Sequence, residues 1–233
     1  MIRQVSKLVS GTAIGTLIAV ATLAAPSDAA SLGKYTFGPV GGFTTNATGV
    51  DPSVTFSAFS QGGGLTNVGS TLVGNPLLAI RASGWNGDAT DFFAFTVAAN
   101  AGKQLTINSL KLDSARFGGP TGLQIRSSLD SFDSVLASTG VGTGILGTSF
   151  ASANLVLAGL TNLTAPVTFR IVGIGTPTGF PNARFLTLDN VELDGAVTAV
   201  PTPALLPALM GLGVAAIRKR KAQNAEQLAE VES

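Results

Sequence analysis

The side chains of this chain that could act in catalysis or bind a metal ion are its carboxylates, because its 233 residues include no His and no Cys. That absence excludes Ser-His-Asp and Cys-His catalysis, the usual zinc and haem ligand sets, and disulfides. The common mechanism of glycoside hydrolysis needs two facing carboxylic acids. Glu192 is the only Glu between residues 30 and 199, and it has no evident partner in the sequence. We therefore expect a protein that is not an enzyme.

Two groups of oxygen-bearing side chains could hold a metal ion. Asp88 and Asp91 follow the single Trp, Trp85, and Asp189 and Asn190 lie in the last polar-apolar stretch before the C-terminal segment. Calcium takes about six to eight oxygen ligands from several segments, and no regularly spaced Asp-rich loop supplies them here. We expect no cofactor. If calcium binds, a resemblance to lectin-like sandwiches implies Asp189 and Asn190 as its ligands.

Trp85 and Asp130 are the candidate residues for binding a sugar. Trp85 precedes the turn residues Asn86 and Gly87, so its ring could offer a stacking surface with an N–H group at its edge. The alternative is a Trp of the hydrophobic core. Residues 126–132 resemble the strand-turn-strand of carbohydrate-binding and discoidin-like jelly rolls, which implies a binding role for Asp130. The alternative is an ordinary turn residue, since Asp bonds its own backbone in turns.

Clustered basic charge, which nucleic-acid binding requires, is absent from residues 30–199. These residues carry eight Lys and Arg against nine Asp and Glu, a net charge of −1. Residues 142–147 match the pattern GxGxxG, but they lie in a Gly- and Thr-rich stretch that no helix pattern follows. We expect neither a nucleotide site nor a nucleic-acid partner.

Alternation of apolar and polar residues predicts β-strands. The apolar residues of segments 93–97 and 167–171 alternate with small or polar ones. This period of two indicates half-buried antiparallel strands, so we expect Phe93, Phe95 and Phe169 to be buried.

The same pattern predicts the fold. In two runs the apolar alternation slips by one residue, at 108–109 and at 189–190, and a β-bulge at each place would restore the inward face. Residues 131–137 are a further expected strand. About nine to eleven short strands, separated by Gly, Pro, Asn and Ser, predict an all-β fold: an antiparallel β-sandwich, specifically a jelly roll, between two terminal helices.

Residues 1–29 have the pattern of a signal peptide. Two basic residues precede an uncharged apolar stretch, residues 8–25. Small residues at Ser27 and Ala29 form an AxA-like site, which places cleavage between Ala29 and Ala30. The alternative is an uncleaved membrane anchor, because the uncharged stretch approaches the length of a membrane span.

A second apolar segment, residues 205–217, lies between a proline motif and a basic cluster. The motif consists of Pro201, Thr202, Pro203 and Ala204, and the cluster of Arg218, Lys219, Arg220 and Lys221. A helix of this segment would be about 20 Å long, short of the ~30 Å hydrocarbon core, and so a marginal transmembrane span. The positive-inside rule would keep the cluster in the cytoplasm and the preceding domain outside. The alternative is an apolar helix docked on the domain.

This order of motif, apolar helix and basic cluster resembles the C-terminal sorting signal of PEP-CTERM proteins, most closely the Pro-Thr-Pro-Ala (PTPA-CTERM) variant. The resemblance implies a precursor held transiently in the inner membrane and processed by an exosortase-type membrane protease-transpeptidase. It differs from the commoner form in having Thr202 where Glu usually stands, and in the tail of residues 222–233. The chain then divides into a signal peptide (1–29), a β-sandwich cargo domain (30–199), the sorting signal (200–221) and a polar tail (222–233).

The resemblance also implies a location and a role. We expect an exported protein of the cell surface or extracellular matrix with a structural or adhesive role in exopolysaccharide or the envelope, and polysaccharide as a partner. The alternative function is a lectin-like carbohydrate-binding module, dependent on calcium or independent of it.

Overall fold

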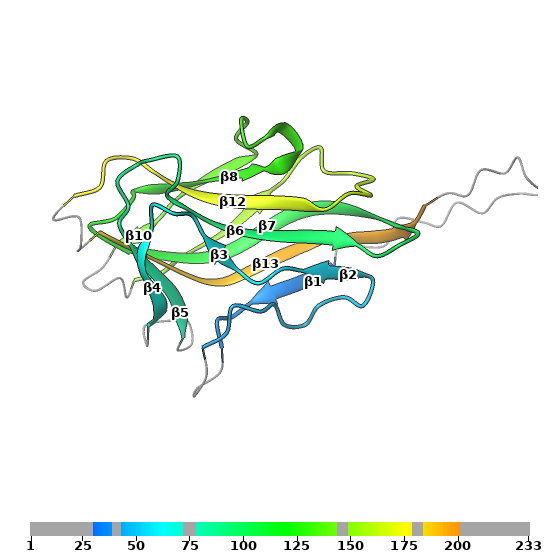
Figure 1. Cartoon of the computed structure of the whole chain (residues 1–233), viewed down its shortest axis with the longest axis horizontal. Coiled ribbons are helices and arrows are strands. Elements are labelled where there is room, and N and C mark those ends of the chain that lie inside the picture. Colours follow the sequence, from blue (N-terminus) through cyan, green and yellow to red (C-terminus); the bar gives the residue numbers. More distant parts are fainter. Residues whose placement is uncertain (1–29, 39–42, 72–77, 144–148, 179–183, 201–233) are drawn as a thin grey trace, which may run out of the picture.

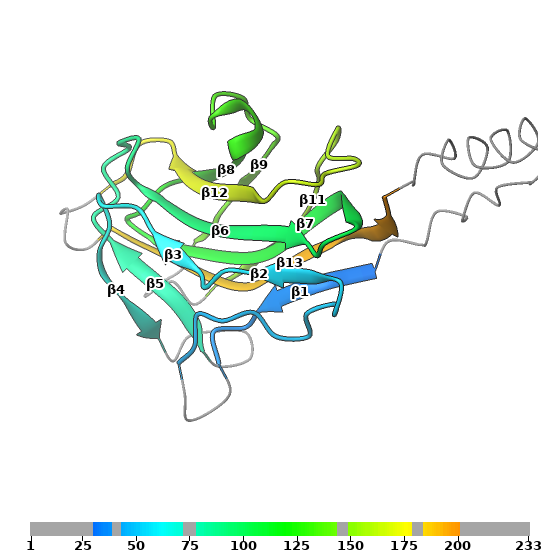
Figure 2. The ribbon, with the colours of Figure 1, turned by 45° about the vertical axis from the view of Figure 1, so that its right-hand side comes forward.

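The computed structural model describes residues 30–38, 43–71, 78–143, 149–178 and 184–200. Within these ranges the chain forms β-strands and one short 3-10 helix, η1 (Ser128–Asp130), which confirms the all-β prediction. The strands lie in two layers, sheet A and sheet B (Figure 1). Turned by 45°, the ribbon shows β6 and β12 of sheet B passing above β5 and β13 of sheet A (Figure 2).

Each sheet combines strands that are distant in the sequence. Sheet A contains β1 (Ala30–Tyr35), β4 (Thr66–Thr71), β5 (Ala79–Ser83), β7 (Lys103–Phe117), β10 (Gly142–Thr143), β11 (Ala151–Val156) and β13 (Phe185–Ala199). Its order is β10-β7-β13-β5-β4, with β1 paired to β13 and β11 to β7. Sheet B contains β2 (Val54–Phe56), β3 (Ser60–Gln61), β6 (Phe92–Ala99), β8 (Gly122–Ser127), β9 (Ala137–Gly140) and β12 (Val167–Ile174). Its order is β2-β6-β12-β8-β9, with β3 paired to β6.

The core lies between the two sheets and is rich in aromatic rings. Phe93, Phe95 and Phe169 are each at most 1% exposed, as their alternation predicts. Tyr35 of sheet A packs against Phe95 of sheet B with ring centroids 5.4 Å apart, so the rings join the layers. Buried aromatic pairs at such separations stabilise a core beyond the effect of buried area alone.

The predicted bulges are present in the central pair of sheet A, where β7 and β13 run antiparallel. The register shifts between Asp189 and Glu192, and Asn190 adopts a positive φ of 51°. A second shift opposite residues 107–109 makes Asn108 the extra residue on β7. The bulges return the apolar residues of both strands to the core after each slip, so this part of the prediction is confirmed.

Two details differ from the sequence prediction. The sandwich is not wholly antiparallel, because β10 pairs with β7 in parallel, joining Gly142 to Ala115. Residues 131–137 do not form one strand: after η1 the chain turns, and β9 begins only at Ala137. The physical reason is that Ser131 and Phe132 both have left-handed backbone angles, with φ of 62° and 67°, which a strand cannot accommodate.

The first strand of the chain, β1, pairs with the last, β13. β1 runs antiparallel to β13, with Ala30 opposite Gly195 and Tyr35 opposite Val191. The first residues of β1 and the last residues of β13 therefore lie at the same end of the molecule (Figure 1).

The predicted signal helix and sorting helix fall on residues 1–29 and 201–233, outside the described residues. Among the residues that the structure describes, no helix is long and apolar enough to span a membrane.

Candidate functional site: a groove on the outer face of sheet B

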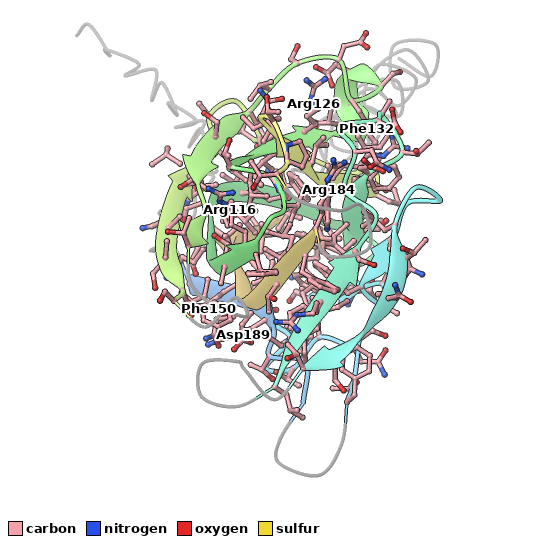
Figure 3. All side chains as sticks on the ribbon, turned by 90° about the vertical axis from the view of Figure 1, so that its left-hand side faces the viewer. Arg116, Arg126, Phe132, Phe150, Arg184 and Asp189 are labelled. Carbon is pink, nitrogen blue, oxygen red and sulfur yellow. The ribbon has the colours of Figure 1, made fainter. Side chains whose placement is uncertain are left out.

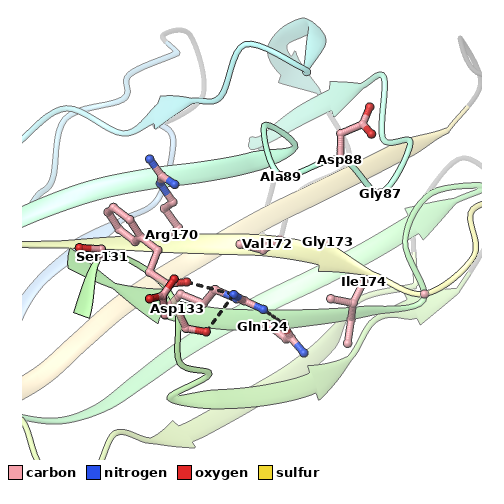
Figure 4. Close-up of a pocket in the computed structure, with 13 residues that line it drawn as sticks. Gly87, Asp88, Ala89, Gln124, Ser131, Asp133, Arg170, Val172, Gly173 and Ile174 are labelled. Atoms are coloured by element: carbon pink, nitrogen blue, oxygen red, sulfur yellow. Dashed lines mark hydrogen bonds between the residues drawn. The ribbon is translucent and has the colours of Figure 1, made fainter. Parts of the chain in front are cut away.

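A groove of about 570 Å³ lies on the outer face of sheet B. Its floor is made by Gln124 and Arg126 of β8 and by Arg170 of β12 together with residues 172–175. Residues 87–89 form one wall and residues 131–133 the other (Figure 4). Strand alternation produces this arrangement: in β12 the residues at 167, 169 and 171 are buried, so those at 168, 170 and 172 face outward.

Arg170 is held between two aromatic rings. Its guanidinium carbon lies 4.1 Å from the centroid of the Phe92 ring and 3.7 Å from that of the Phe132 ring. Two rings cannot share one face of a guanidinium at these distances, so Phe92 of sheet B and Phe132 of the wall lie on opposite sides of it. Both contacts are cation–π interactions, which favour a guanidinium lying over a ring face.

Arg126 has a different role, because it holds the wall that residues 131–133 form. Its Nη1 donates to the carbonyl oxygens of Phe132 at 3.0 Å and of Asp133 at 3.2 Å, and its Nη2 donates to Oε1 of Gln124 at 2.9 Å. Figure 3 shows Arg126 and Phe132 close together, well apart from Asp189. Hydrogen bonds from a charged donor are stronger than neutral ones, so Arg126 holds the left-handed turn in the position where Phe132 reaches Arg170.

Asp130 stabilises the same turn from its other side. Its Oδ2 accepts a hydrogen bond from the backbone N–H of Ser134 at 2.8 Å. Hydrogen bonding by the side chain and backbone of Ser134 lowers the pKa of Asp130 below its ordinary value. Asp130 precedes the wall residues 131–133 but is not among those that line the groove. In this structure Asp130 therefore has the backbone-bonding role of a turn residue, which was the alternative interpretation of the sequence.

Asp91 positions the opposite wall. Its fully buried carboxylate accepts, at Oδ2, the backbone N–H groups of Asn86 at 2.7 Å, Gly87 at 3.0 Å and Asp88 at 3.1 Å. One carboxylate oxygen thus closes the loop that brings Asp88 to the groove. Three backbone donors on one acceptor fix this loop more firmly than its Gly and Asn content would suggest.

Trp85 lies in the core. It is 1% exposed, its Nε1 donates to the carbonyl oxygen of Ala82 at 3.0 Å, and its ring packs on Phe93 with centroids 5.6 Å apart. Its ring does not face the groove, so in this structure Trp85 offers no stacking surface to a sugar.

Asp189 and Asn190 lie on the other layer, beside a depression of about 420 Å³ on sheet A that Asn190 helps to line. The Nδ2 of Asn190 donates to Asp113 at 2.8 Å, and the hydroxyl of Ser152 donates to the other oxygen of Asp113 at 2.5 Å. Asp189 is 1% exposed, and its Oδ1 accepts the backbone N–H of Asn190 at 2.7 Å. Within the described parts of the chain, no three His, Cys, Asp or Glu side chains are grouped as a metal site would require.

Glu192 borders the same depression and lies near Lys111, with 3.9 Å between the charged atoms. Lys111 also contacts Asp194 at 2.6 Å, and this hydrogen bond raises the pKa of Lys111 above its ordinary value. Glu192 is therefore on sheet A, separated from the groove by the core.

Arg170, Phe92 and Phe132 were not identified from the sequence as site residues. The alternation of β12 places Arg170 on the outer face, and that signal was available. The two rings that hold it come from residues 78 and 38 positions earlier, and no local pattern connects them to it.

Comparison with known proteins identifies no family. No family model and no curated protein sequence matches the chain. Among solved structures, a family 11 carbohydrate-binding module of a Clostridium thermocellum cellulase is 11% identical, with 72% of this chain and 97% of that chain covered and a TM-score of 0.37. A cleaved adhesin domain of Lys-gingipain from Porphyromonas gingivalis is 13% identical, with 72% and 98% covered and a TM-score of 0.36.

A third match is a glycoside hydrolase family 43 arabinoxylan arabinofuranohydrolase from Bacillus subtilis, 15% identical with a TM-score of 0.33. The match covers 53% of this chain and 21% of the length of that enzyme. Likenesses this distant identify neither a family nor a ligand. The class that the structure itself defines is an all-β protein of two sheets with a polar and aromatic groove on the outer face of one of them.

Proposed function

We propose that the protein is a non-catalytic, carbohydrate-binding protein of the cell surface or extracellular matrix, and that the groove on sheet B is its binding site. The observation that carries the proposal is the composition of the groove. Phe132 and the aliphatic Val172 and Ile174 offer apolar surface to the C–H groups of a sugar, and Gln124, Ser131 and two carboxylates surround them. A concave site that combines apolar surface with a few convergent polar groups is typical of small-molecule recognition.

The carboxylates of Asp88 and Asp133 suit hydroxyl recognition. Neither has an ion-pair partner within 4.0 Å among the residues that the structure describes. Free carboxylate oxygens accept hydrogen bonds from hydroxyl groups. No proton transfer or nucleophilic attack is part of the proposal, which agrees with the absence of His and Cys from the chain.

The chain path supports a jelly roll as the finer description of the sandwich. From β5 to β8 successive strands alternate between sheet A and sheet B, and β12 and β13 again lie in different sheets. Such crossing between two packed sheets is a feature of the jelly roll.

A glycan array probed with the full-length protein, with calcium and with a chelator, tests the binding function. Val172→Trp places a large ring in the groove and is expected to abolish every signal. Val156→Trp is the matched control, because Val156 is 72% exposed on β11 of the other sheet. Loss of binding in both variants, or in neither, would contradict the assignment of the groove. Signals that vanish with the chelator would support the calcium-dependent alternative.

The sorting pathway is a separate proposal and rests on the sequence alone. We propose that an exosortase-type enzyme processes the chain within the motif of residues 201–204 after transient anchoring in the inner membrane. Two prolines leave this segment without two backbone donors, so a protease can engage it without melting a helix. Mass spectrometry of the mature surface protein is expected to find a C-terminus between Pro201 and Ala204. Recovery of the intact C-terminal Ser233 would contradict it.

A further inference from the structure

The N–H edge of Arg170 is the unusual feature of the groove. Among the residues that the structure describes, no acceptor takes a hydrogen bond from its guanidinium, and no carboxylate oxygen lies within 4.0 Å of it. Arg126, directly opposite Arg170 on β8, uses both terminal nitrogens to hold protein groups. Arg170 thus carries an unpaired charge that faces the groove (Figure 4).

The two rings determine how this charge is presented. Phe92 and Phe132 occupy the faces of the guanidinium, so only its planar edge is left for a ligand. The rings also restrict rotation of the side chain, and a donor that is already oriented loses less entropy when it binds. A planar guanidinium edge matches a carboxylate, whose two oxygens can accept two parallel N–H bonds.

The pairing of β12 with β8 is a second observation that favours an anion at Arg170. In the register of β12 and β8, Arg170 lies beside Arg126, and like charges directly opposite each other destabilise a sheet. An anion at Arg170 would relieve that repulsion. The groove as a whole is not strongly positive, because Asp88 and Asp133 also line it. A densely charged polyanion is therefore disfavoured, and a single carboxylate on an otherwise neutral sugar is favoured.

We propose that Arg170 binds the carboxylate of a uronic acid residue, so that the groove selects acidic polysaccharides over neutral ones. This inference rests on the proposed function, because it assigns the ligand class of the same groove. The remaining polar groups of the groove would bind hydroxyls of the same sugar and of its neighbours. Selectivity would then come from the shape of the guanidinium edge and not from net charge.

Calorimetric titration of the full-length protein tests the proposal. The probes are a galacturonic acid hexamer, its fully methyl-esterified form, a neutral cellulose hexamer and dextran sulfate. We expect the free acid to bind at least about tenfold more tightly than its ester, since charge-assisted hydrogen bonds are among the strong ones. The esterified hexamer is the decisive control, because it differs from the acid only at the carboxylates.

Three variants separate geometry from charge. Arg170→Gln is expected to bind acid and ester equally. Arg170→Lys keeps the charge but loses the planar edge, and is expected to lose most of the preference. Lys103→Gln removes one charge at an exposed position of β7 and is expected to change nothing. Urea unfolding monitored by Trp85 fluorescence confirms that each variant is folded.

Each remaining outcome has a defined meaning. Equal binding of acid, ester and neutral hexamer, abolished by Val172→Trp, would overturn the carboxylate inference and leave the groove assignment intact. Tighter binding of dextran sulfate than of the acid would overturn it in favour of a sulfate ester. Full preference retained in Arg170→Lys would show that net charge alone selects the ligand and would also overturn it. Binding that Val172→Trp leaves unchanged would overturn the groove assignment itself.

Discussion

Arg126 and Arg170 lie directly opposite each other on β8 and β12, yet their guanidinium groups have opposite roles. Arg126 donates to two carbonyl oxygens of the turn that follows β8, whereas Arg170 is covered by rings and keeps its edge free of partners among the described residues. Phe132 connects the two, because Arg126 binds its carbonyl oxygen and Arg170 contacts its ring. A change at either Arg should therefore affect the other through this residue.

Replacing Arg126 by Ala should make the wall of residues 131–133 more mobile. The carbonyl oxygens of Phe132 and Asp133 would lose their donor, and we expect a loss of about 1–3 kcal/mol in the free energy of unfolding. Urea titration followed by Trp85 fluorescence measures it. Lys103→Gln serves as the control for the lost charge. A fully retained stability, together with unchanged amide exchange at residues 131–134, would show that Arg126 does not hold the turn.

Replacing Asp91 by Ala should loosen the opposite wall. Three backbone N–H groups would lose their common acceptor, which we expect to cost about 3 kcal/mol or more. Amide hydrogen exchange at residues 86–88 should become much faster, while exchange in β12 should change only through the global stability. Asp91→Asn retains an acceptor oxygen and should lie between the two. Slow exchange at residues 86–88 in the Ala variant would contradict this role.

Tyr35 should make the protein sensitive to alkali. Burial raises its pKa well above the ordinary value of 10.0, although a hydrogen bond to Ser57 opposes this effect. A raised pKa in the folded state means that stability is complete below pH 10 and falls as the pH rises above it, because the unfolded chain ionises first. Tyr35 is the only tyrosine, so phenolate absorbance reports it alone. We expect that absorbance to appear together with unfolding, and Tyr35→Phe to remove this part of the pH dependence. A phenolate that forms near pH 10 in the folded protein would contradict the prediction.

Protonation of Asp130 at acid pH should weaken the turn that it stabilises. Its pKa is lowered in the folded protein. Its contribution to folding stability is therefore present above the ordinary pKa of 3.8, and it is lost as the pH falls below that value through the folded pKa. Carbon-detected NMR titration should place its midpoint below 3.8, and the ring signals of Phe132 should lose dispersion over the same range. Asp130→Asn should abolish that dependence. An unshifted midpoint would mean that the bond to Ser134 does not persist in solution.

The pattern of apolar residues predicted the sheets well, because burial on one face of a strand imposes a period of two. It located both bulges of the β7 and β13 pair from slips of one residue, and it identified the core rings Phe93, Phe95 and Phe169. It failed at residues 131–137, where Ser131 and Phe132 have positive φ angles and the turn accepts a hydrogen bond from a side chain of β8. The site was less predictable than the sheets. Arg170 becomes distinctive only when the fold brings Phe92 and Phe132 to it.

The antiparallel neighbours β1 and β13 determine how the molecule responds to force. Ala30 and Ala199 mark the start of one strand and the end of the other, at the same end of the sandwich. A pull between these two residues would break the hydrogen bonds of the pair in succession, so β1 would peel away at low force and take Leu32 and Tyr35 out of the core. A pull between Ala199 and a ligand held on sheet B would instead load β13 along its length against β7, where residues 103–117 resist together. A molecule tethered only through its C-terminal strand would thus carry load by shear, the direction in which a long pair of strands is strongest.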